Sequence, residues 1–483
     1  MKTKITLLFS LYLLGQIIII QFSTHHIETL DWDINSFLVV SQEFGRSNLP
    51  FENQYENKPP LLFFAFYIFS FLAGDNVLYI KILNDLIIFL LAFSLLIISN
   101  KNIQSEFWSF VPSIIFIFFI SNIWFHPEYS EYISLLFIAS AYIVLKTENI
   151  KQRSFLSGLL ISFSTLINLG TIFFVLGLLF VNYLNSKQKL KSFREFVLGF
   201  SSLQILIFFI YYFNGLSSDY FMSMIKIPLT YSETNFSLVQ NITTFLKAFQ
   251  NYNTLIYVLL IISISLFISN LLSVLKSRNF NKNRNLDILI MISCSMFFYI
   301  FAKKGYYHHL IFLLYFCSLT FSWVNTGLTK RIIFTVTIFS IFSVNTLFFP
   351  QSFKNLKNLN SIENKYPIKI LSEELKPKIN KNQNVFSTNH ILILYYLNVP
   401  NYSYIVHPAL YDYPEITEVL IKNKKINQDE VEYIIRKSPD VLEGNFELKT
   451  IDNSYYKLDT KHIDLNLLEY WEKDRSINIF ISK

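Results

Sequence analysis

The stretch DINSFLVVSQEFGRSNLPFENQYENKPPLLFF, residues 33–64, places an acid, Asp33, and a lysine, Lys58, between two very apolar parts of the chain. Charged groups avoid the hydrocarbon of a bilayer and gather where helices leave it. We therefore interpret this stretch as part of a loop that lies between membrane-seeking segments. The segments on either side decide whether that interpretation holds.

The composition of the chain is that of a membrane protein. Of its 483 residues, 52% are hydrophobic and 16% are charged, whereas a soluble domain usually has about 25% charged residues. Apolar runs of roughly 18 or more residues, long enough to cross a bilayer as helices, recur over residues 1–350. Soluble helices need a polar face, which these runs lack. The sequence therefore predicts a polytopic α-helical membrane protein.

The N-terminal run MKTKITLLFSLYLLGQIIIIQF, residues 1–22, is interpreted as a retained first membrane span. Its apolar part is long for a signal peptide, and no small-residue cleavage site follows it. The two cysteines, Cys294 and Cys317, fall inside apolar segments. We expect them to be packing residues rather than a disulfide or a metal site.

The basic residues give a topology. Loops rich in Lys and Arg face the cytoplasm in membrane proteins, and such loops occur here at residues 1–4, 146–153, 187–194, 276–284 and 329–331. The N-terminus is then cytoplasmic. The segments expected outside are residues 23–77, 126–132, 214–252, 302–309 and everything after about 350.

This alternation predicts about eleven spans. They are expected near residues 5–22, 78–99, 107–123, 130–146, 155–168, 171–185, 195–213, 254–275, 286–302, 308–325 and 332–349. The apolar run 155–185 is too long for one helix and is divided at Gly170 into a tight hairpin. The short run 59–74 begins with two prolines, and we expect it to lie along the outer interface, because counting it as a span would reverse every later loop.

After Pro350 the composition changes to Asn, Lys, Glu and Asp with short apolar segments. We interpret residues 351–483 as a soluble α/β domain outside the membrane, separate from a membrane domain of residues 1–350 that includes the first outer loop, residues 23–77. Strands are expected at NVFST (384–388), YSYIVH (402–407) and VEYIIRK (431–437).

The charged residues expected outside gather at one face of the membrane, at the boundary between lipid and water. That position suits chemistry on a lipid-borne substrate, whose polar head lies at this depth while its tail stays in the hydrocarbon. The residues concerned are Asp31, Asp33, Lys58, Glu128, Glu131, Lys303, Lys304, His308 and His309.

The first outer loop resembles that of the membrane glycosyltransferases of the GT-C class. The run of Asp33, Phe37, Gly45, Pro50-Phe51 and Lys58-Pro59-Pro60-Leu61 is similar to the loop of the dolichyl-phosphate-mannose protein mannosyltransferases and the lipid A aminoarabinose transferases (ArnT). Three later segments resemble the same family in order and spacing: GDNVLYIKILNDLI (74–87), SEYISLLFIASAYIVLK (130–146) and KKGYYHHLIFLLYF (303–316).

Two departures from the family pattern are present. The family usually has a second acid directly after the first, and Ile34 stands there instead. The late helix also lacks the proline that commonly follows its histidine. The first departure leaves open whether Asp31 substitutes for the second acid and whether a divalent cation is held near Asp33.

The resemblance implies transfer of a sugar, with inversion, from a polyprenyl-phosphate donor to a lipid, glycan or protein acceptor. Such a reaction needs one carboxylate to take the acceptor's proton and cations to bind the leaving phosphate. Asp33 is then the general base, and Lys58 binds the phosphate. Glu131 matches the family's second outer acid, for which Glu128 is the alternative. Further substrate contacts are expected from Lys81, Lys304, His308 and Asp31.

Each of these residues also has a purely structural interpretation. Asp31 can cap the helix that follows it, and both Lys58 and Lys81 can reach along apolar side chains to the interface. His308 and His309, as neighbours on a helix, are expected to point about 100° apart, so no metal site is predicted from them. His25 and His26 are interpreted as surface residues.

The expected localisation is the bacterial inner membrane, with the active site and the C-terminal domain outside and no nucleic-acid partner. Two other functions are alternatives. A transporter or flippase of lipid-linked sugars tends to carry ionisable groups near the bilayer midplane, whereas the mid-span positions here are almost purely apolar. An O-antigen-type polymerase or ligase is expected to have arginine-rich outer loops, and Arg46 is the main arginine in the outer loops here.

Overall fold

The protein is described from a computed structural model. The residues that it describes are 2–28, 31–74, 76–102, 108–121, 129–147, 150–233, 239–240, 243, 254–277, 286–302, 307–324, 327–379, 384–444, 446, 455–468 and 477–482.

The chain divides into two compact units, and each unit is built from segments far apart in the sequence. Unit 1 comprises residues 1–23, 84–207 and 234–353, and unit 2 comprises residues 24–83, 208–233 and 354–483. Unit 2 therefore joins most of the first outer loop to the C-terminal segment. The borders fall inside three helices, α4 (Val77–Asn102), α9 (Lys189–Phe213) and α16 (Gly327–Lys357).

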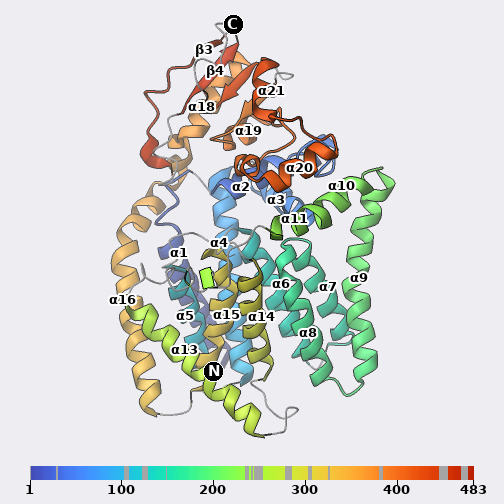
Figure 1. Ribbon diagram of the computed structural model, residues 1–483. Helices are drawn as coiled ribbons and strands as arrows, with labels where there is room; N and C mark the ends of the chain where they lie inside the picture. Colours follow the sequence, from blue (N-terminus) through green and yellow to red (C-terminus); the bar gives the residue numbers. More distant parts are fainter. Residues whose placement is uncertain are drawn as a thin grey trace. The chain divides into compact units, whose positions relative to one another are not determined.

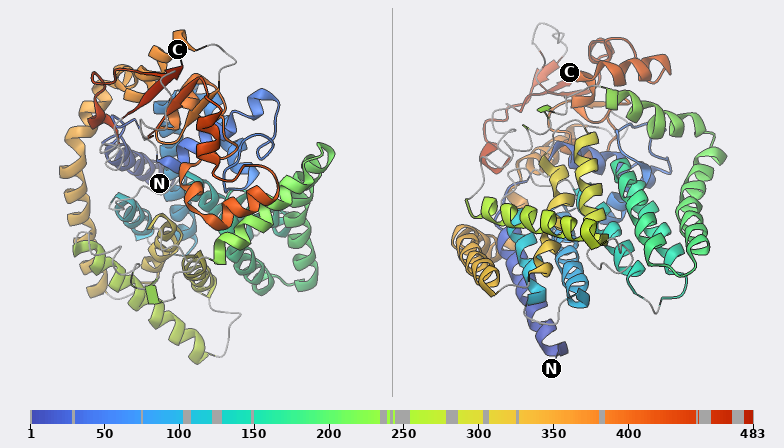
Figure 2. Two further views of the ribbon diagram at one scale, coloured as in Figure 1. Left: turned by 45° about the horizontal axis from the view of Figure 1, so that its top comes forward. Right: turned by 60° about the horizontal axis from the view of Figure 1, so that its bottom comes forward.

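Unit 1 consists of helices joined by turns, with no strand among its described residues. Besides its parts of α4, α9 and α16, it contains α1 (Lys2–Gln21), α5 (Val111–Ser121), α6 (Tyr129–Leu145), α7 (Arg153–Thr165), α8 (Ile172–Asn185), α13 (Thr254–Ser277), α14 (Leu286–Ala302) and α15 (Leu310–Leu319). Helices α6, α7 and α8 pack side by side (Figure 1, Figure 2). All ten side chains of α15 are buried, so this helix forms part of the core of unit 1.

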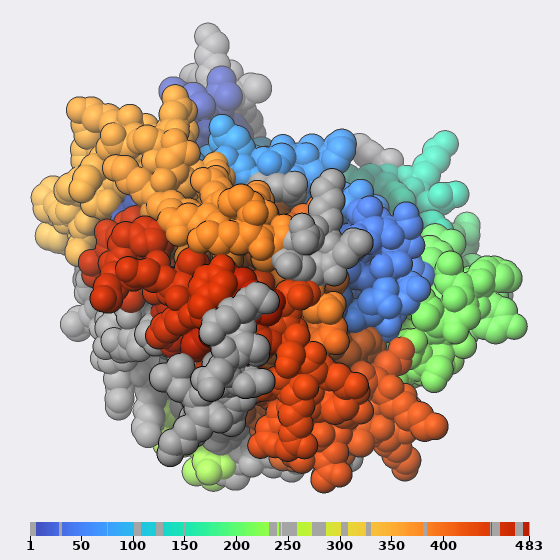
Figure 3. All heavy atoms as spheres, turned by 90° about the horizontal axis from the view of Figure 1, so that it is seen from above, coloured from blue at the N-terminus to red at the C-terminus, as the bar shows by residue number. Residues whose placement is uncertain are grey.

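Unit 2 combines short helices with a small sheet. Its helices are α2 (Trp32–Ser41), α3 (Pro60–Ala73), α10 (Ser217–Phe221), α11 (Ile227–Glu233), α17 (Leu359–Ile362), α18 (Pro367–Leu375), α19 (Leu392–Leu397), α20 (Pro414–Lys422) and α21 (Glu430–Arg436). Helix α2 packs on α3 and on α19. Figure 3 shows the first-loop part of unit 2 in blue against the orange and red C-terminal part of the same unit.

The sheet confirms the predicted mixture of helices and strands near the C-terminus. Its strands are β1 (Val385–Ser387), β2 (Val441–Glu443), β3 (Tyr455–Lys457) and β4 (Ile479–Ser482), in the order β1-β2-β4-β3. Strands β1 and β2 are parallel, with Phe386 beside Leu442, and the other pairs are antiparallel. A small core forms on it from Phe386, Leu442, Phe480 and the helical Ile434.

The strand predicted at residues 431–437 is wrong, because this segment forms helix α21. Val431, Ile434 and Ile435 recur at helical spacing. Ile434 belongs to the small core beside β1 and β2, and Val431 and Ile435 pack against it. The segment 402–407 also differs from its prediction. It forms no regular strand and makes a single bridge, from Ile405 to Tyr55 in the first loop.

Among the described residues, three helices are long and apolar enough to cross a membrane: residues 77–100, 189–213 and 330–357. Eight shorter apolar helices accompany them, within residues 6–21, 60–73, 108–121, 129–145, 169–185, 258–272, 286–300 and 310–323. Ten of the eleven predicted spans coincide with one of these apolar helices. The predicted span 155–168 forms helix α7 (Arg153–Thr165), which is not among them. The predicted count of eleven spans stays a prediction.

The predicted break at Gly170 is confirmed. Helix α7 ends at Thr165, a short 3₁₀ turn covers Leu169–Thr171, and α8 follows at once. A Cβ atom on Gly170 would lie 2.2 Å from the Phe298 ring, so only glycine fits here without a shift of that ring. The turn is held locally, because the Asn168 side chain accepts a hydrogen bond from the Gly170 N–H.

The last apolar helix is longer than predicted. Helix α16 continues through Pro350 to Lys357, although a span ending near residue 349 was expected. Proline removes one backbone hydrogen bond within a helix without always ending it. The change in composition therefore precedes the end of the helix.

Helix α3 confirms the short helix predicted at residues 59–74. Pro60 stands in its first turn, where its missing N–H costs no hydrogen bond, and Gly74 ends it in a left-handed conformation with φ of 59°. The exposed side chains Phe64, Ile68, Phe71 and Leu72 follow one another at helical spacing. Such a face is suited to the lipid–water interface.

A pair of glycines allows α7 and α9 to touch at backbone distance. A Cβ atom on Gly158 would lie 2.1 Å from the carbonyl oxygen of Phe196, and one on Gly199 would lie 2.1 Å from that of Phe155. Small residues permit such close approach between membrane helices. We expect Gly158→Ala to lower the free energy of unfolding by about 1–3 kcal/mol, because the helices must move apart.

Thermal unfolding of the purified protein in detergent measures this effect. Gly15→Ala is the matched control, since no atom lies within 4 Å of its added Cβ inside helix α1. That variant should be neutral or more stable by about 0.5–1 kcal/mol. Equal loss of stability in both variants would contradict the packing argument.

Candidate functional site

Asp33 lies in the first turn of helix α2, in unit 2. One carboxylate oxygen, Oδ1, lies 2.5 Å from Nε2 of His407. The other oxygen, Oδ2, lies 4.0 Å from Nζ of Lys58. The second distance permits attraction but is too long for a direct hydrogen bond. The structure thus brings the predicted base and the predicted phosphate ligand together.

Lys58 is held by the chain around it. Its backbone N–H donates to the carbonyl of Glu56 at 2.9 Å, and Pro59 and Pro60 follow and begin helix α3. A residue before proline has few backbone conformations available. The ammonium group also lies 5.4 Å from the centre of the Phe37 ring, on helix α2. Lys58 is therefore directed toward α2 and Asp33.

The C-terminal part of unit 2 pairs with the first loop just before this point. Tyr55 donates its N–H to Tyr404 at 2.6 Å and accepts from the N–H of Val406 at 3.1 Å. The rings of Tyr55 and Tyr404 stack, with their centres 5.7 Å apart. The buried Gln54 side chain adds hydrogen bonds to the backbone of Asn401 and Ser403. This pairing brings His407 to Asp33.

Two further acids belong to the same cluster. Burial, with the like charge of Asp33, raises the pKa of Asp31 to about 7. Burial also raises the pKa of Glu56 to about 7. The negative charge of Asp33 adds to this rise, and the positive charges of His407 and Lys58 reduce it. Near neutral pH these two acids are therefore partly protonated. The cluster does not carry three full negative charges.

His407 responds to the same carboxylates. Burial lowers the pKa of His407, but the charges of Asp33 and Glu56 outweigh burial and raise this pKa to about 9. Its other ring nitrogen, Nδ1, accepts the N–H of Ala409 at 3.1 Å. Its ring also lies edge-on to Trp32, with the ring centres 6.1 Å apart.

Asp31 stands at the N-cap position of helix α2, as its structural interpretation expects. Its side chain makes no capping hydrogen bond of regular geometry, but the backbone N–H groups of Trp32 and Asp33 in the first turn still act on its carboxyl group and favour the charged form. Its φ of 125° is far from the extended conformation usual at this position. The carboxylate also adds to the charge around Asp33 and His407.

Lys81, predicted to contact substrate, has partners within unit 2. Its ammonium group donates to the carbonyl of Ile27 and lies 5.7 Å from the centre of the Tyr366 ring. These contacts connect the start of α4 to the first loop and to the C-terminal segment. They favour a structural role for Lys81.

His25, interpreted as a surface residue, is buried. Its carbonyl accepts a hydrogen bond from the Tyr366 hydroxyl at 2.7 Å. The neighbouring His26 lies within hydrogen-bond distance of Asn355, at 3.1 Å. The C-terminal segment thus contacts both histidines, and it buries His25 while His26 stays partly exposed.

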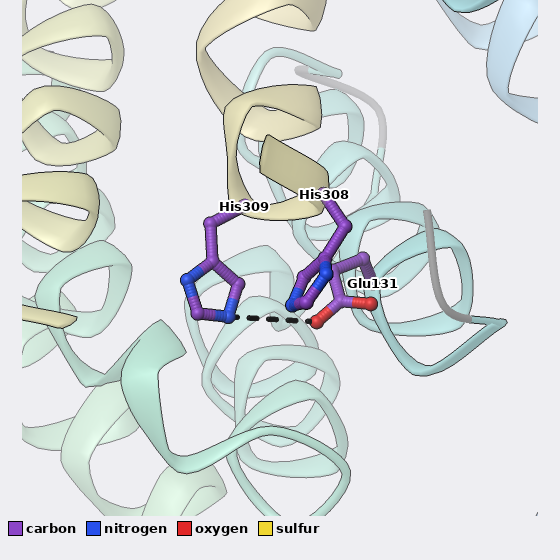
Figure 4. A group of neighbouring side chains, drawn as sticks. All are labelled: Glu131, His308 and His309. Atoms are coloured by element: carbon purple, nitrogen blue, oxygen red, sulfur yellow. Dashed lines mark ion pairs between the residues drawn. The ribbon is translucent and has the colours of Figure 1, made fainter. Parts of the chain in front are cut away.

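A second cluster lies in unit 1, where Glu131 of α6 meets His308 and His309 before α15 (Figure 4). Glu131 is fully buried, and its Oε1 lies 3.9 Å from Nε2 of His309 and 3.3 Å from the Asn168 amide nitrogen. One ligand atom from each of the three residues lies within 4.8 Å of the others. The cluster thus brings together two residues that the sequence analysis predicts for the site, Glu131 and His308.

The expectation that the two imidazoles point apart is wrong. His308 and His309 lie in a 3₁₀ turn, Tyr307–His309, rather than inside the α-helix. Their ring centres are 4.4 Å apart. Two imidazoles and a carboxylate are ligand types that Zn²⁺ prefers. Among the residues that the structure describes, Asp33 belongs to no comparable group of three ligands.

Two predicted site residues, Glu128 and Lys304, lie outside the described residues. Two residues that the sequence did not indicate, Glu56 and His407, lie in the Asp33 cluster. Glu56 stands two positions before the lysine of the NKPP motif, so its place in the first loop was a usable signal. His407 is 374 residues from Asp33, and nothing in its local sequence marks it.

Solved structures match most of the chain. The crystal structure of ArnT from Cupriavidus metallidurans bound to undecaprenyl phosphate matches with a TM-score of 0.62 and 9% identity, over 97% of each chain. The chain has the ArnT fold. The apo ArnT structure from the same organism matches with a TM-score of 0.56 and 8% identity, over 90% of this chain and 92% of the other. No protein-family model matches, and no curated protein matches by sequence.

The ArnT fold is the one that the sequence resemblance predicted, so this prediction is confirmed. At 9% identity the likeness establishes the fold alone. The residues of the Asp33 cluster and of the Glu131 cluster are therefore assigned from this chain's own geometry.

The Glu131 cluster predicts a measurable metal content. We expect the purified protein to bind about one Zn²⁺ per chain and Glu131→Gln to retain well below half of it, because the buried carboxylate ligand is lost. Elemental mass spectrometry after dialysis measures the content. Glu374→Gln, in the exposed pair with His462, is the control. Equal zinc in the natural protein and in Glu131→Gln would contradict the assignment.

Proposed function

We propose that this protein is an inverting glycosyltransferase. It moves a sugar from a polyprenyl-phosphate donor to an acceptor at the outer face of the membrane. The observation that carries the proposal is the neighbouring Asp33 and Lys58 in the first loop of a chain with the ArnT fold. The ArnT structure bound to undecaprenyl phosphate supports a polyprenyl carrier for the donor.

The proposed reaction uses Asp33 as the general base. The acceptor's oxygen or nitrogen attacks the anomeric carbon of the sugar and forms the new glycosidic bond, while the bond from that carbon to the phosphate oxygen breaks. The acceptor's proton passes to the Asp33 carboxylate. The polyprenyl phosphate leaves with the bonding electron pair, and Lys58 stabilises its charge.

We propose the membrane arrangement that the loop charges indicate. The N-terminus is cytoplasmic, and residues 351–483 lie outside an inner membrane together with the site. The exposed apolar face of α3, with Phe64, Ile68 and Phe71, then lies in the outer lipid–water interface. This arrangement puts Asp33 and Lys58 at the depth of a lipid phosphate.

Mass spectrometry of membrane lipids and glycans tests the function. Cells lacking the protein should accumulate a sugar-carrying polyprenyl phosphate and lose one glycosylated product. Expression of the natural chain should reverse both changes. Loss of the product without accumulation of the donor at the outer face would instead indicate a flippase.

Asp33→Asn tests the base. The substitution keeps the shape of the side chain but removes its charge, so transfer should fall by roughly 10²–10⁴-fold. The assay uses purified variants in nanodiscs with the donor lipid extracted from cells that lack the protein. Asp31→Asn should be far milder. Near-normal turnover in Asp33→Asn would mean that another residue is the general base.

Lys58→Ala tests the phosphate contact. Binding of undecaprenyl phosphate should weaken by roughly 1.5–3 kcal/mol, the worth of one charge-assisted hydrogen bond. Lys58→Arg should recover part of the loss. Lys365→Ala, which removes an exposed lysine of the same unit, is the control. Unchanged binding in Lys58→Ala would mean that this lysine only anchors the loop.

A further inference from the structure

The hydrogen bond from His407 connects the C-terminal segment to the proposed base. We infer that His407 is a positioning residue of the active site, whose Nε2–H holds Oδ1 of Asp33 so that Oδ2, on the Lys58 side, takes the acceptor's proton. This inference rests on the proposed function. It makes the C-terminal segment part of the active site rather than a separate cover.

The direction of the hydrogen bond follows from the second ring nitrogen. Nδ1 accepts the Ala409 N–H at 3.1 Å, and an acceptor nitrogen in a neutral imidazole leaves the proton on the other nitrogen. Nε2 therefore carries a proton and donates to Asp33. A second proton on the ring would sit on Nδ1 and cost it the Ala409 hydrogen bond, so this contact favours the neutral ring, whereas the nearby carboxylates favour the charged one. Nε2 keeps its proton in either case, so the donation to Asp33 holds in both charge states.

The backbone fixes the ring in place. His407 precedes Pro408, which restricts its backbone, and its φ of −78° and ψ of 115° are those of an extended residue. One residue earlier, the N–H of Val406 bonds to the first loop at Tyr55. The ring itself is buried. Because its backbone and its Nδ1 are both held, the His407 ring can orient the Asp33 carboxylate.

In the described part of the chain, the charged and titratable groups that surround the ring come from the first loop. They are Asp31 and Asp33 at the start of α2, and Glu56 and Lys58 before α3. Glu56 is buried, and its Oε2 has no hydrogen-bond partner among the described residues. His407 thus donates a hydrogen bond to Asp33 beside two other acids, Asp31 and Glu56, that are partly protonated near neutral pH.

His407→Ala tests the role directly. We expect kcat to fall by about 10- to 100-fold, the range that one hydrogen bond to a charged group supports. The KM for the donor lipid should stay nearly unchanged, since Lys58 and the fold remain. His407→Gln should recover much of the rate, because its amide nitrogen can donate to Oδ1. His407→Phe, of similar size without a donor, should not.

The pH profile separates positioning from simple packing. Loss of the donor makes the Asp33 carboxylate easier to protonate. The acid limb of kcat/KM should therefore move to higher pH in His407→Ala and His407→Phe, and less in His407→Gln. His462→Ala is the matched control. It breaks another histidine–carboxylate pair in the C-terminal segment, with Glu374, and should change neither rate nor profile.

A double variant gives the decisive comparison. If His407 acts through Asp33, adding His407→Ala to Asp33→Asn should slow transfer no further. A full additional loss in the double variant, normal turnover in His407→Ala, or equal rates in His407→Gln and His407→Phe would overturn the inference. If Asp33→Asn alone keeps normal turnover, the proposed base itself fails. Binding of undecaprenyl phosphate shows that each variant is folded.

Discussion

The pairing of residues 51–56 with residues 401–407 is the interaction on which unit 2 depends. Backbone hydrogen bonds join Tyr55 to Tyr404 and Val406, and the Gln54 side chain satisfies three backbone groups of the other segment. The Tyr404 hydroxyl donates to the carbonyl of Phe51 at 2.7 Å. These groups are buried, and buried polar groups that lose their partners are costly. The register between the two segments is therefore strongly determined.

That register determines the electrostatics of the Asp33 cluster. A shift by one residue would move the His407 ring away from Asp33, which would lose the hydrogen bond from Nε2. Of the two basic side chains described in this cluster, Lys58, 4.0 Å from Asp33, would then be the one that remains beside the acid. Burial already raises the pKa of Asp31 and of Glu56 to about 7, so these acids give up part of their charge. His407 compensates part of the negative charge that remains.

A second carboxylate, Glu131, has a different environment in unit 1. It is fully buried among Ser130, Asn168 and His309, and each of these offers it a polar atom. The predicted hairpin at Gly170 supplies Asn168 from the turn between α7 and α8. The two acids that the family resemblance implies thus have distinct partners. Asp33 has a lysine and a histidine, and Glu131 has imidazoles and an amide.

Several features were determined by the sequence alone. The apolar runs set the positions of the helices, because a bilayer-length run without charges has few other uses. The break at Gly170 and the helix Pro60–Ala73 follow from local glycine and proline chemistry. Asp33 and Lys58 lie in one loop whose motif resembles a known family, so their proximity could be predicted.

Only the tertiary structure decided the rest. His407 meets Asp33 across 374 residues through a pairing that no local pattern marks. The segment 431–437 has apolar residues compatible with either a strand or a helix, and the small core beside β1 and β2 selects the helix. His308 and His309 converge because the chain turns there in a 3₁₀ conformation. In each case the structure is decided by a long-range contact or by the geometry of a turn. The spacing of apolar residues along the sequence predicts neither of these.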